Sequence, residues 1–247
     1  MRRKVLLLFL ISLFLIVPNV VSAKEYTFNV CENCEWNLDN LDELESHVGD
    51  LENDDYSDNV LENKYIIEFE DGNYNFDYRF PMFETNNTEL HFGEGTYTFD
   101  QLSLEGFRYV IKGKGVGKTI INTNSIGSED NRVVGIFDLS LNINNDFYLD
   151  TYGDDFNNVY GDQYMPSLIF NNVKYVSDKA LYFEFENDGD WSYEIPNQIV
   201  DNLHITNSDF SNGNLYFGVD GIVNYISISN TKLNKVYAGY GITLKID

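Results

Sequence analysis

From Tyr65 onward, apolar and polar side chains alternate in short runs that are separated by glycine-containing turns. This alternation is typical of short β-strands that bury one face. The run Ile67–Asp77 returns as Leu90–Asp100, each residue being matched 23 positions later (90 minus 67). The same interval separates Leu203–Ser208 from Ile226–Thr231 (226 minus 203). Repetition at this period predicts a solenoid whose coils stack on one another.

Because alternate side chains of a strand point inward, the repeat also predicts which residues are partners in neighbouring coils. Leu168 and Phe170 precede Leu203 and Ile205 by 35 (203 minus 168). Residues 181–185 precede residues 215–219 by 34 (215 minus 181). This coil therefore carries an insertion of about a dozen residues. For the last coil, the interval of 23 pairs Leu215 with Ala238, Phe217 with Tyr240 and Val219 with Ile242.

Three asparagines, Asn172, Asn207 and Asn230, follow equivalent strands at one corner of the coils. Asparagine tolerates the left-handed conformation that a sharp corner requires, and its amide both donates and accepts hydrogen bonds. We therefore expect an internal ladder of amides that links neighbouring coils. The alternative is that the three are unrelated asparagines in surface turns.

The N-terminal segment has a different pattern. Arg2–Lys4 precede an unbroken apolar run, Val5–Val17, and a small-residue site follows at Val21–Ala23. This order predicts a secretory signal peptide over residues 1–23 and a mature chain that begins at Lys24. The apolar run is shorter than the ~18 residues of a spanning helix, so an uncleaved anchor is the weaker alternative. We expect a secreted, extracellular or cell-surface protein with no transmembrane segment in the mature chain.

Cys31 and Cys34 are the only cysteines of the chain. The sequence holds neither a second cysteine pair nor a nearby histidine pair that would complete a zinc site, and an exported protein meets an oxidising environment. These observations favour a local disulfide, with two free thiols as the alternative.

Four apolar residues after the cysteines recur close to helical spacing, and Asn40 to Glu43 match a capping box. They are Leu38, Leu41, Leu44 and Val48. We expect a short amphipathic helix over residues 37–48, followed by an acidic loop, Gly49–Lys64. Residues 24–64 then form an N-terminal cap region, and residues 65–247 the solenoid.

The strand-like alternation continues to the last residue of the sequence, with no closing helix after it. A solenoid end without a cap exposes strand edges. We therefore expect either a solenoid truncated at its C-terminus or end-to-end association with another chain.

A glycine-rich segment, Gly113–Thr119, invites comparison with a phosphate-binding loop. Its spacing is one residue short of that motif, and the β-branched run Thr119–Ile121 favours a strand where the motif needs a helix. The segment is better explained as a turn between two strands, and nucleotide binding is not expected.

The formal net charge is -24 at pH 7, from 40 acidic and 16 basic residues. Such a surface repels nucleic acid and anionic lipid, and it attracts cations. The charge serves either solubility outside the cell or a calcium-loaded surface, and solubility is the simpler explanation.

Two insertions, residues 144–166 and 186–197, are rich in aromatic and acidic residues. If Phe137–Ile143 is the second strand of its coil, both insertions leave from the same corner and lie side by side. Aromatic rings stack on sugars and carboxylates accept hydrogen bonds from sugar hydroxyls, so we expect a glycan site or a site for a cell-surface partner. The alternative is that these loops merely fold on themselves. The expected ligand-binding residues are Tyr148, Tyr152, Tyr160, Trp191 and Tyr193.

Calcium is the one metal ion that the insertions suggest, because their carboxylates could supply oxygen ligands. The candidates are Asp150, Asp154, Asp188 and Asp190. Neither insertion matches a complete EF-hand loop, so no cofactor is expected.

Several segments in order resemble the start of right-handed, single-stranded parallel β-helix proteins of the pectin-lyase-like superfamily. They are the Cys31-x-x-Cys34 pair, the amphipathic helix, Ile67-x-Phe69-x-x-Gly72-x-Tyr74, and the strand pair with Gly113-x-Gly115. The resemblance covers essentially the whole mature chain and is closest to asparagine- and aromatic-rich, adhesin-like surface proteins of archaea. It implies an all-β solenoid whose N-terminal end is capped by the helix.

The superfamily includes pectate lyases, polygalacturonases and pectin esterases, so the resemblance also raises the question of catalysis. None of His47, His91 and His204 lies in the Gly-His-Gly of polygalacturonases, and none of Arg79, Arg108 and Arg132 lies in a lyase motif. A glycosidase would need two carboxylates across one sugar. The candidates are Asp154, Asp155, Asp188 and Asp190. A non-catalytic, adhesin-like role is expected, with a polysaccharide lyase or glycoside hydrolase as the alternative.

Overall fold

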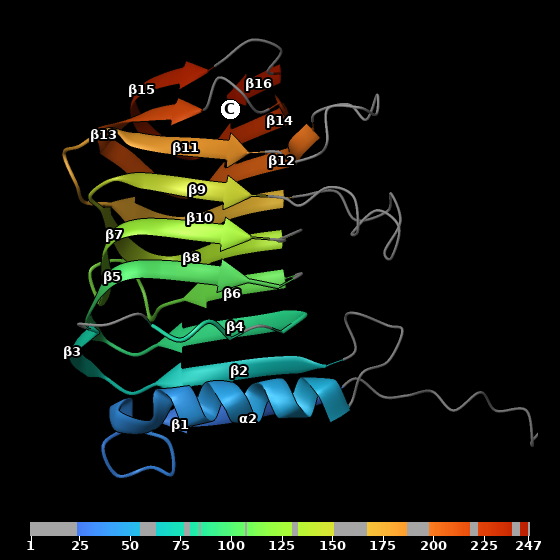
Figure 1. Cartoon of the computed structure of the whole chain (residues 1–247). Helices are drawn as coiled ribbons and strands as arrows, with labels where there is room; N and C mark the ends of the chain where they lie inside the picture. The colour runs from blue at the N-terminus through green and yellow to red at the C-terminus, as the bar shows by residue number, and fades with distance from the viewer. Residues whose placement is uncertain are drawn as a thin grey trace, which may run out of the picture.

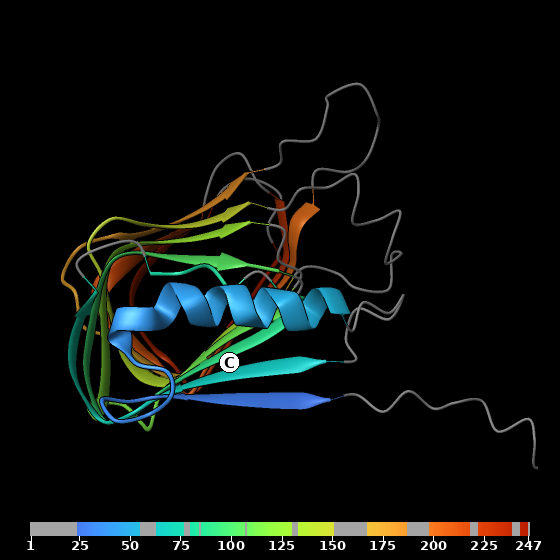
Figure 2. The same cartoon turned by 60° about the horizontal axis from the view of Figure 1, so that its bottom comes forward.

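The computed structural model describes residues 24–54, 63–76, 80–83, 85–106, 108–129, 133–150, 167–186, 198–217, 222–238 and 243–246. Within these residues the chain is mostly β with one α-helix, and the strands form one parallel sheet that curls on itself (Figures 1 and 2). The helical segments are η1 (Leu38–Asn40) and α2 (Leu41–Asp54). The strands are β1 (Glu25–Val30), β2 (Lys64–Phe69), β3 (Gly72–Phe76), β4 (Asn87–Phe92), β5 (Gly95–Glu105), β6 (Arg108–Lys112), β7 (Thr119–Glu129), β8 (Val133–Ile143), β9 (Asp146–Asp150), β10 (Ser167–Tyr175), β11 (Leu181–Glu186), β12 (Gln198–Thr206), β13 (Asp209–Phe217), β14 (Ile222–Ser229), β15 (Lys232–Ala238) and β16 (Thr243–Ile246).

The parallel pairings divide the curled sheet into three faces, which we number along the chain. The first face holds β1, β2, β4, β6, β12, β14, β16 and the first halves of β8 and β10. The second face holds β3, the first parts of β5, β7, β13 and β15, and the second halves of β8 and β10. The third face holds β9, β11 and the later parts of β5, β7, β13 and β15.

The repeat read from the sequence is confirmed by the strand register. Ile67 lies opposite Leu90, and Ile205 opposite Ile228, as the interval of 23 requires. The longer predicted interval of 35 residues is also confirmed, because Leu168 pairs with Leu203 despite the insertion between them. In Figure 1 the coils are piled from α2 and β1 at one end to β15 and β16 at the other.

Columns of equivalent side chains fill the interior of the curl. Phe69 stacks on Phe92 with 4.9 Å between ring centroids, and Phe76 stacks on Phe99 at 4.6 Å. Each strand turns alternate side chains inward, so equivalent residues of successive coils meet at the spacing of neighbouring strands, about 4.8 Å. The core is therefore one continuous cluster along the described coils.

One prediction of register is wrong. Leu215 pairs with Val236 rather than Ala238, and Phe217 pairs with Ala238 rather than Tyr240. The register shifts between Phe210 and Asn214, where β13 contains more residues than β15 opposite it. A bulge of this kind leaves extra residues unpaired, and counting repeats along the sequence cannot detect it.

The N-terminal region also differs from its prediction. β1 pairs with β2 from Glu25 to Val30, so a strand of the first face precedes the helix, inside the segment assigned to the cap. The helix continues to Asp54, which makes part of the expected Gly49–Lys64 loop helical. Its capping box joins Asn37 and Asn40 instead of Asn40 and Glu43, because the chain first makes the 3-10 turn η1.

The apolar stripe of the helix packs on the end of the sheet, where Figure 2 shows α2 lying across the curl. Leu41, Leu44 and Val48 are buried there, as expected. Leu38 is 40% exposed, because it belongs to η1 and not to the α-helical stripe.

The expected insertion at residues 144–166 begins later than predicted. Residues 146–150 form β9, which pairs with β7 and β11, and the Phe147 side chain is fully buried. The alternation of Phe147 and Leu149 with polar neighbours is the strand signal that the acidic composition obscured.

Candidate functional site

A column of three tyrosines lies on the outer surface of the third face. Tyr182, Tyr216 and Tyr237 stand opposite one another on β11, β13 and β15. Their ring centroids are 4.7 Å and 4.3 Å apart, with interplanar angles of 21° and 7°. Tyr182 is 43% exposed and Tyr237 44% exposed. We call this column, which spans three coils, the tyrosine strip.

The residues that follow these tyrosines explain why the strip is regular. Phe183 and Phe217 point into the core, where their rings stack with 5.0 Å between centroids. Because successive side chains of a strand point to opposite sides, this buried column sets the register of the tyrosines outside it. The strip is thus held in place by the core beneath it.

The strip presents hydroxyl groups and ring edges to solvent. Desolvation by neighbouring groups raises the pKa of Tyr216, and a hydrogen bond with the Tyr237 hydroxyl raises it further. The ordinary pKa of a tyrosine is already far above neutral, so the Tyr216 phenol is protonated at pH 7 and can donate as well as accept hydrogen bonds. Rings with an apolar body and a polar tip suit a ligand that carries both hydroxyls and C–H surfaces.

The two insertions leave from neighbouring strands of this same third face. Asp150 at the end of β9 lies opposite Glu186 at the end of β11. The expectation that they start side by side is therefore correct for the strands that lead into them. The backbone of Tyr148 and Asp150 belongs to β9. The remaining predicted site residues, Tyr152, Asp154, Asp155, Tyr160, Asp188, Asp190, Trp191 and Tyr193, lie outside the described residues.

The sequence repeat predicts two of the three residues of the tyrosine strip as partners. The interval of 34 between residues 181–185 and 215–219 places Tyr182 opposite Tyr216. Tyr237 was missed because the bulge in β13 shortens its interval from Tyr216 to 21 (237 minus 216). Aromatic residues are also concentrated in the two insertions, so composition points to the insertions and not to the strands.

A charged network occupies the outer surface of the first face, away from the tyrosine strip. Glu89 lies 2.8 Å from His91 through one carboxylate oxygen and 2.8 Å from Arg108 through the other, while Lys64 is 3.8 Å away. The hydrogen bond with His91, followed by the contacts of Arg108 and Lys64, outweighs partial burial and lowers the pKa of Glu89 to about 2. A carboxylate held ionised in this way is suited to linking strands.

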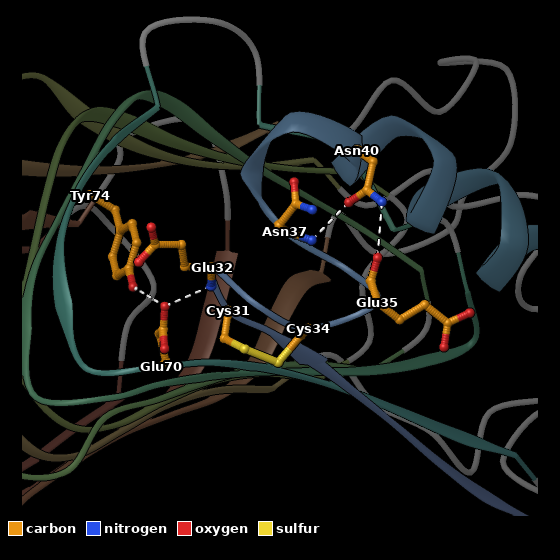
Figure 3. Close-up of a disulfide and its surroundings, with 8 residues drawn as sticks. All are labelled: Cys31, Glu32, Cys34, Glu35, Asn37, Asn40, Glu70 and Tyr74. Carbon is orange, nitrogen blue, oxygen red and sulfur yellow. Dashed lines mark hydrogen bonds between the residues drawn. A yellow bond between two sulfur atoms is a disulfide. The ribbon is translucent and has the colours of Figure 1, made fainter.

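Cys31 and Cys34 form the local disulfide that the cysteine count favoured (Figure 3). Beside it, a carboxylate oxygen of Glu70 accepts hydrogen bonds from the Glu32 backbone at 2.9 Å and from the Tyr74 hydroxyl at 3.0 Å. Burial and then the bond to Glu70 raise the pKa of Tyr74 to about 12. A pocket of about 370 Å³ lies between this turn and β2, and its rim carries the acids Glu32, Asp39 and Glu70.

In the glycine-rich turn, residues 113–118, most backbone N–H groups already donate hydrogen bonds within the protein. The N–H groups of Gly113 and Gly115 donate to the carbonyl oxygens of Phe137 and Asp138, at 3.0 Å and 2.7 Å. Those of Lys114 and Gly117 donate to the side-chain oxygens of Thr119 and Ser140. A phosphate-binding loop needs these donors free, so the turn serves the stacking of coils.

Within the described residues, no cluster of three or more histidine, cysteine, aspartate or glutamate side chains is arranged to hold a metal ion. In that same part of the chain, no helix has both the length and the apolar character needed to cross a membrane. No family model matches the sequence, and comparisons with curated proteins and with solved structures also give no match.

Proposed function

We propose that this chain is an exported, adhesin-like protein that binds a glycan at a cell surface through its third face. In this proposal the curled parallel sheet is a right-handed β-helix of the pectin-lyase-like kind, closest to archaeal surface adhesins. The parallel register and the helix at the N-terminal end support that assignment. The observation that carries the function is the exposed tyrosine strip on the face from which both aromatic insertions leave.

In this proposal the tyrosine strip and the insertions contact different parts of the glycan. Tyrosine hydroxyls at the spacing of neighbouring coils, about 4.8 Å, can bond to successive hydroxyls of an extended ligand. The aromatic residues of the insertions, Tyr152, Tyr160, Trp191 and Tyr193, would cover the sugar rings. Binding residues are commonly carried on loops that a rigid scaffold positions.

Glycan-array binding by the purified chain tests this proposal. We expect Tyr182→Ala with Tyr216→Ala, and separately Trp191→Ala, to weaken binding by about tenfold or more, because aromatic contacts dominate such sites. Leu38→Ala, which removes an equally exposed apolar side chain at the other end of the molecule, should leave binding unchanged. Unaltered binding by the double tyrosine variant would exclude the third face as the site.

Catalysis by the same face is the alternative to binding alone, and an activity assay tests it. Incubation with acidic polysaccharides, with and without calcium, would release reducing ends or unsaturated products if Asp154, Asp155, Asp188 and Asp190 formed a hydrolase or lyase site. Either product would replace the binding proposal with an enzymatic one.

A further inference from the structure

The pocket of about 370 Å³ between the disulfide turn and β2 has an apolar lining at an acidic end of the molecule. Its lining includes the buried side chains of Val30 and Phe69 and the Leu38 side chain, which is 40% exposed. We call it the disulfide pocket. In Figure 1 it belongs to the end of the stack that holds α2 and β1, whereas the strands of the tyrosine strip lie towards the other end. Its chemistry is therefore independent of the proposed glycan site.

Three acids line this pocket without a cation to neutralise them. Glu32, Asp39 and Glu70 are exposed, and no described lysine, arginine or histidine lies within salt-bridge distance of their carboxylates. On the outer surface of the first face, in contrast, Glu89 is paired with Arg108 at 2.8 Å. The disulfide pocket therefore combines unbalanced negative charge with apolar surface.

The fold holds one of these carboxylates in a fixed position. One oxygen of Glu70 accepts hydrogen bonds from the Glu32 backbone at 2.9 Å and from the Tyr74 hydroxyl at 3.0 Å (Figure 3). Its other oxygen has no hydrogen-bond partner among the described residues. After burial and the bond to Glu70, the charges of Glu70 and then Glu32 raise the pKa of Tyr74, so both carboxylates act on the same part of the pocket. This part of the pocket is suited to a cationic hydrogen-bond donor.

We propose that the disulfide pocket binds an arginine side chain presented by a partner protein. A guanidinium can donate paired hydrogen bonds to carboxylates such as Glu70 and Glu32, and it stacks on aromatic rings such as that of Tyr74. The arginine methylenes would cover Leu38 and the apolar lining. A volume of several hundred Å³ suits a ligand group of this size. Free arginine would bring its own carboxylate to an acidic rim, whereas an arginine within a chain would not.

Titration of the purified chain with the capped peptide acetyl-Gly-Arg-Gly-amide, followed by calorimetry, tests the proposal. The matched ligand carries citrulline, in which an uncharged urea replaces the guanidinium with nearly the same shape. We expect the arginine peptide to bind at least about tenfold more tightly than the citrulline peptide, with an affinity that falls as salt is added. Free arginine should bind more weakly than the capped peptide. A lysine peptide should also bind more weakly, because an ammonium cannot donate a parallel pair of hydrogen bonds.

Two pairs of substitutions separate the pocket from the net charge of the molecule. E32Q/E70Q should weaken binding of the arginine peptide by at least about tenfold, because it removes two carboxylate charges while glutamine at position 70 can still accept the bonds of the turn. E43Q/D50N changes the net charge by the same amount at exposed acids of α2 that do not line the pocket, and it should bind like the unmodified chain.

Two further variants separate this pocket from the third face. Leu38→Ala should weaken binding of the arginine peptide, because Leu38 lines the pocket, and Tyr216→Ala should leave it unchanged. Equal affinity for the arginine peptide and any of the other ligands, no binding of any peptide, or equal losses in E32Q/E70Q and E43Q/D50N would overturn the proposal.

Discussion

At the scale of single residues, the corner between the first and second faces depends on a backbone conformation that most side chains avoid. Asp138, Asn172, Asn207 and Asn230 have φ values of 56°, 55°, 51° and 47°. The left-handed region costs an ordinary residue about 1–2 kcal/mol, and Asn and Asp tolerate it best. The predicted corner is therefore confirmed in its residues and its conformation.

The ladder that these residues form differs from the predicted one in two respects. Asn230 donates to Asn207 at 2.7 Å, but Asn207 donates to Asn171 at 3.0 Å rather than to Asn172. Asn172 donates instead to Asp138 at 2.8 Å. Asn207 and Asn230 are also exposed, so the ladder is external and not internal. The amide points outward because the single left-handed residue turns its side chain away from the core.

Asn207 offers a test of the two roles of a corner residue. Asn207→Ala loses both the hydrogen bonds and the tolerance of positive φ, so we expect the free energy of unfolding to fall by about 1–3 kcal/mol. Asn207→Gly keeps the tolerance and should cost less. Asn234→Ala, an exposed asparagine outside the ladder, is the control in urea unfolding. Equal losses for alanine and glycine would show that the backbone conformation does not matter.

At the scale of elements, charged side chains join strands of the first face on its outer surface. Glu89 on β4 contacts Lys64 on β2 and Arg108 on β6, so one carboxylate links three successive coils. The side chain is only 12% exposed, and burial makes such contacts stronger than those of free surface pairs. Sequence reasoning missed this network, because the three residues are far apart in the chain and no motif joins them.

The lowered pKa of Glu89 predicts how stability depends on pH. The ionised form is favoured by folding, so its contribution is complete above the ordinary value of 4.5 and is lost as the pH falls towards about 2. Glu89→Gln should lower the free energy of unfolding at neutral pH by on the order of 2 kcal/mol and flatten its pH dependence between these values.

Urea unfolding across that pH range measures the effect. Glu68→Gln is the matched control, because Glu68 is 45% exposed and contacts only His91 in the network, at 3.4 Å. A pH profile for Glu89→Gln that parallels the unmodified chain would show that the network does not stabilise the stack.

At the scale of the whole molecule, the coils form a stack that the helix covers at its N-terminal end. Each coil contributes only short strands and cannot bury its apolar side chains alone, so stability comes from contacts between neighbours. α2 lies across the first coil, where Leu44 and Val48 are fully buried (Figure 2). The helix therefore replaces the missing neighbour of that coil.

Truncation of the buried helix stripe tests this role. Leu44→Ala should lower the free energy of unfolding by about 2–5 kcal/mol, because it removes a fully buried side chain and leaves a cavity. Leu51→Ala, which shortens a partly buried leucine on the same helix, should cost clearly less. Thermal unfolding with light scattering would also detect exposure of the sheet end as earlier aggregation, and similar losses for both variants would contradict a capping role.

The sequence by itself determined the parallel stacking, most partners within the strands and the asparagine corner. These features depend on local alternation and on repetition, which remain visible in a linear chain. The buried pairs Ile67 with Leu90 and Leu168 with Leu203 are where the alternation requires them.

Only the tertiary structure decided where irregular residues fall and which surface residues meet. The bulge in β13, the strand β1 before the helix and the outward direction of the ladder change which side chains are neighbours, without changing the pattern of apolar residues. The tyrosine strip and the Glu89 network are each assembled from residues of different coils. Their proximity depends on coil lengths and bulges, which the stacking of the core resolves and a linear pattern does not.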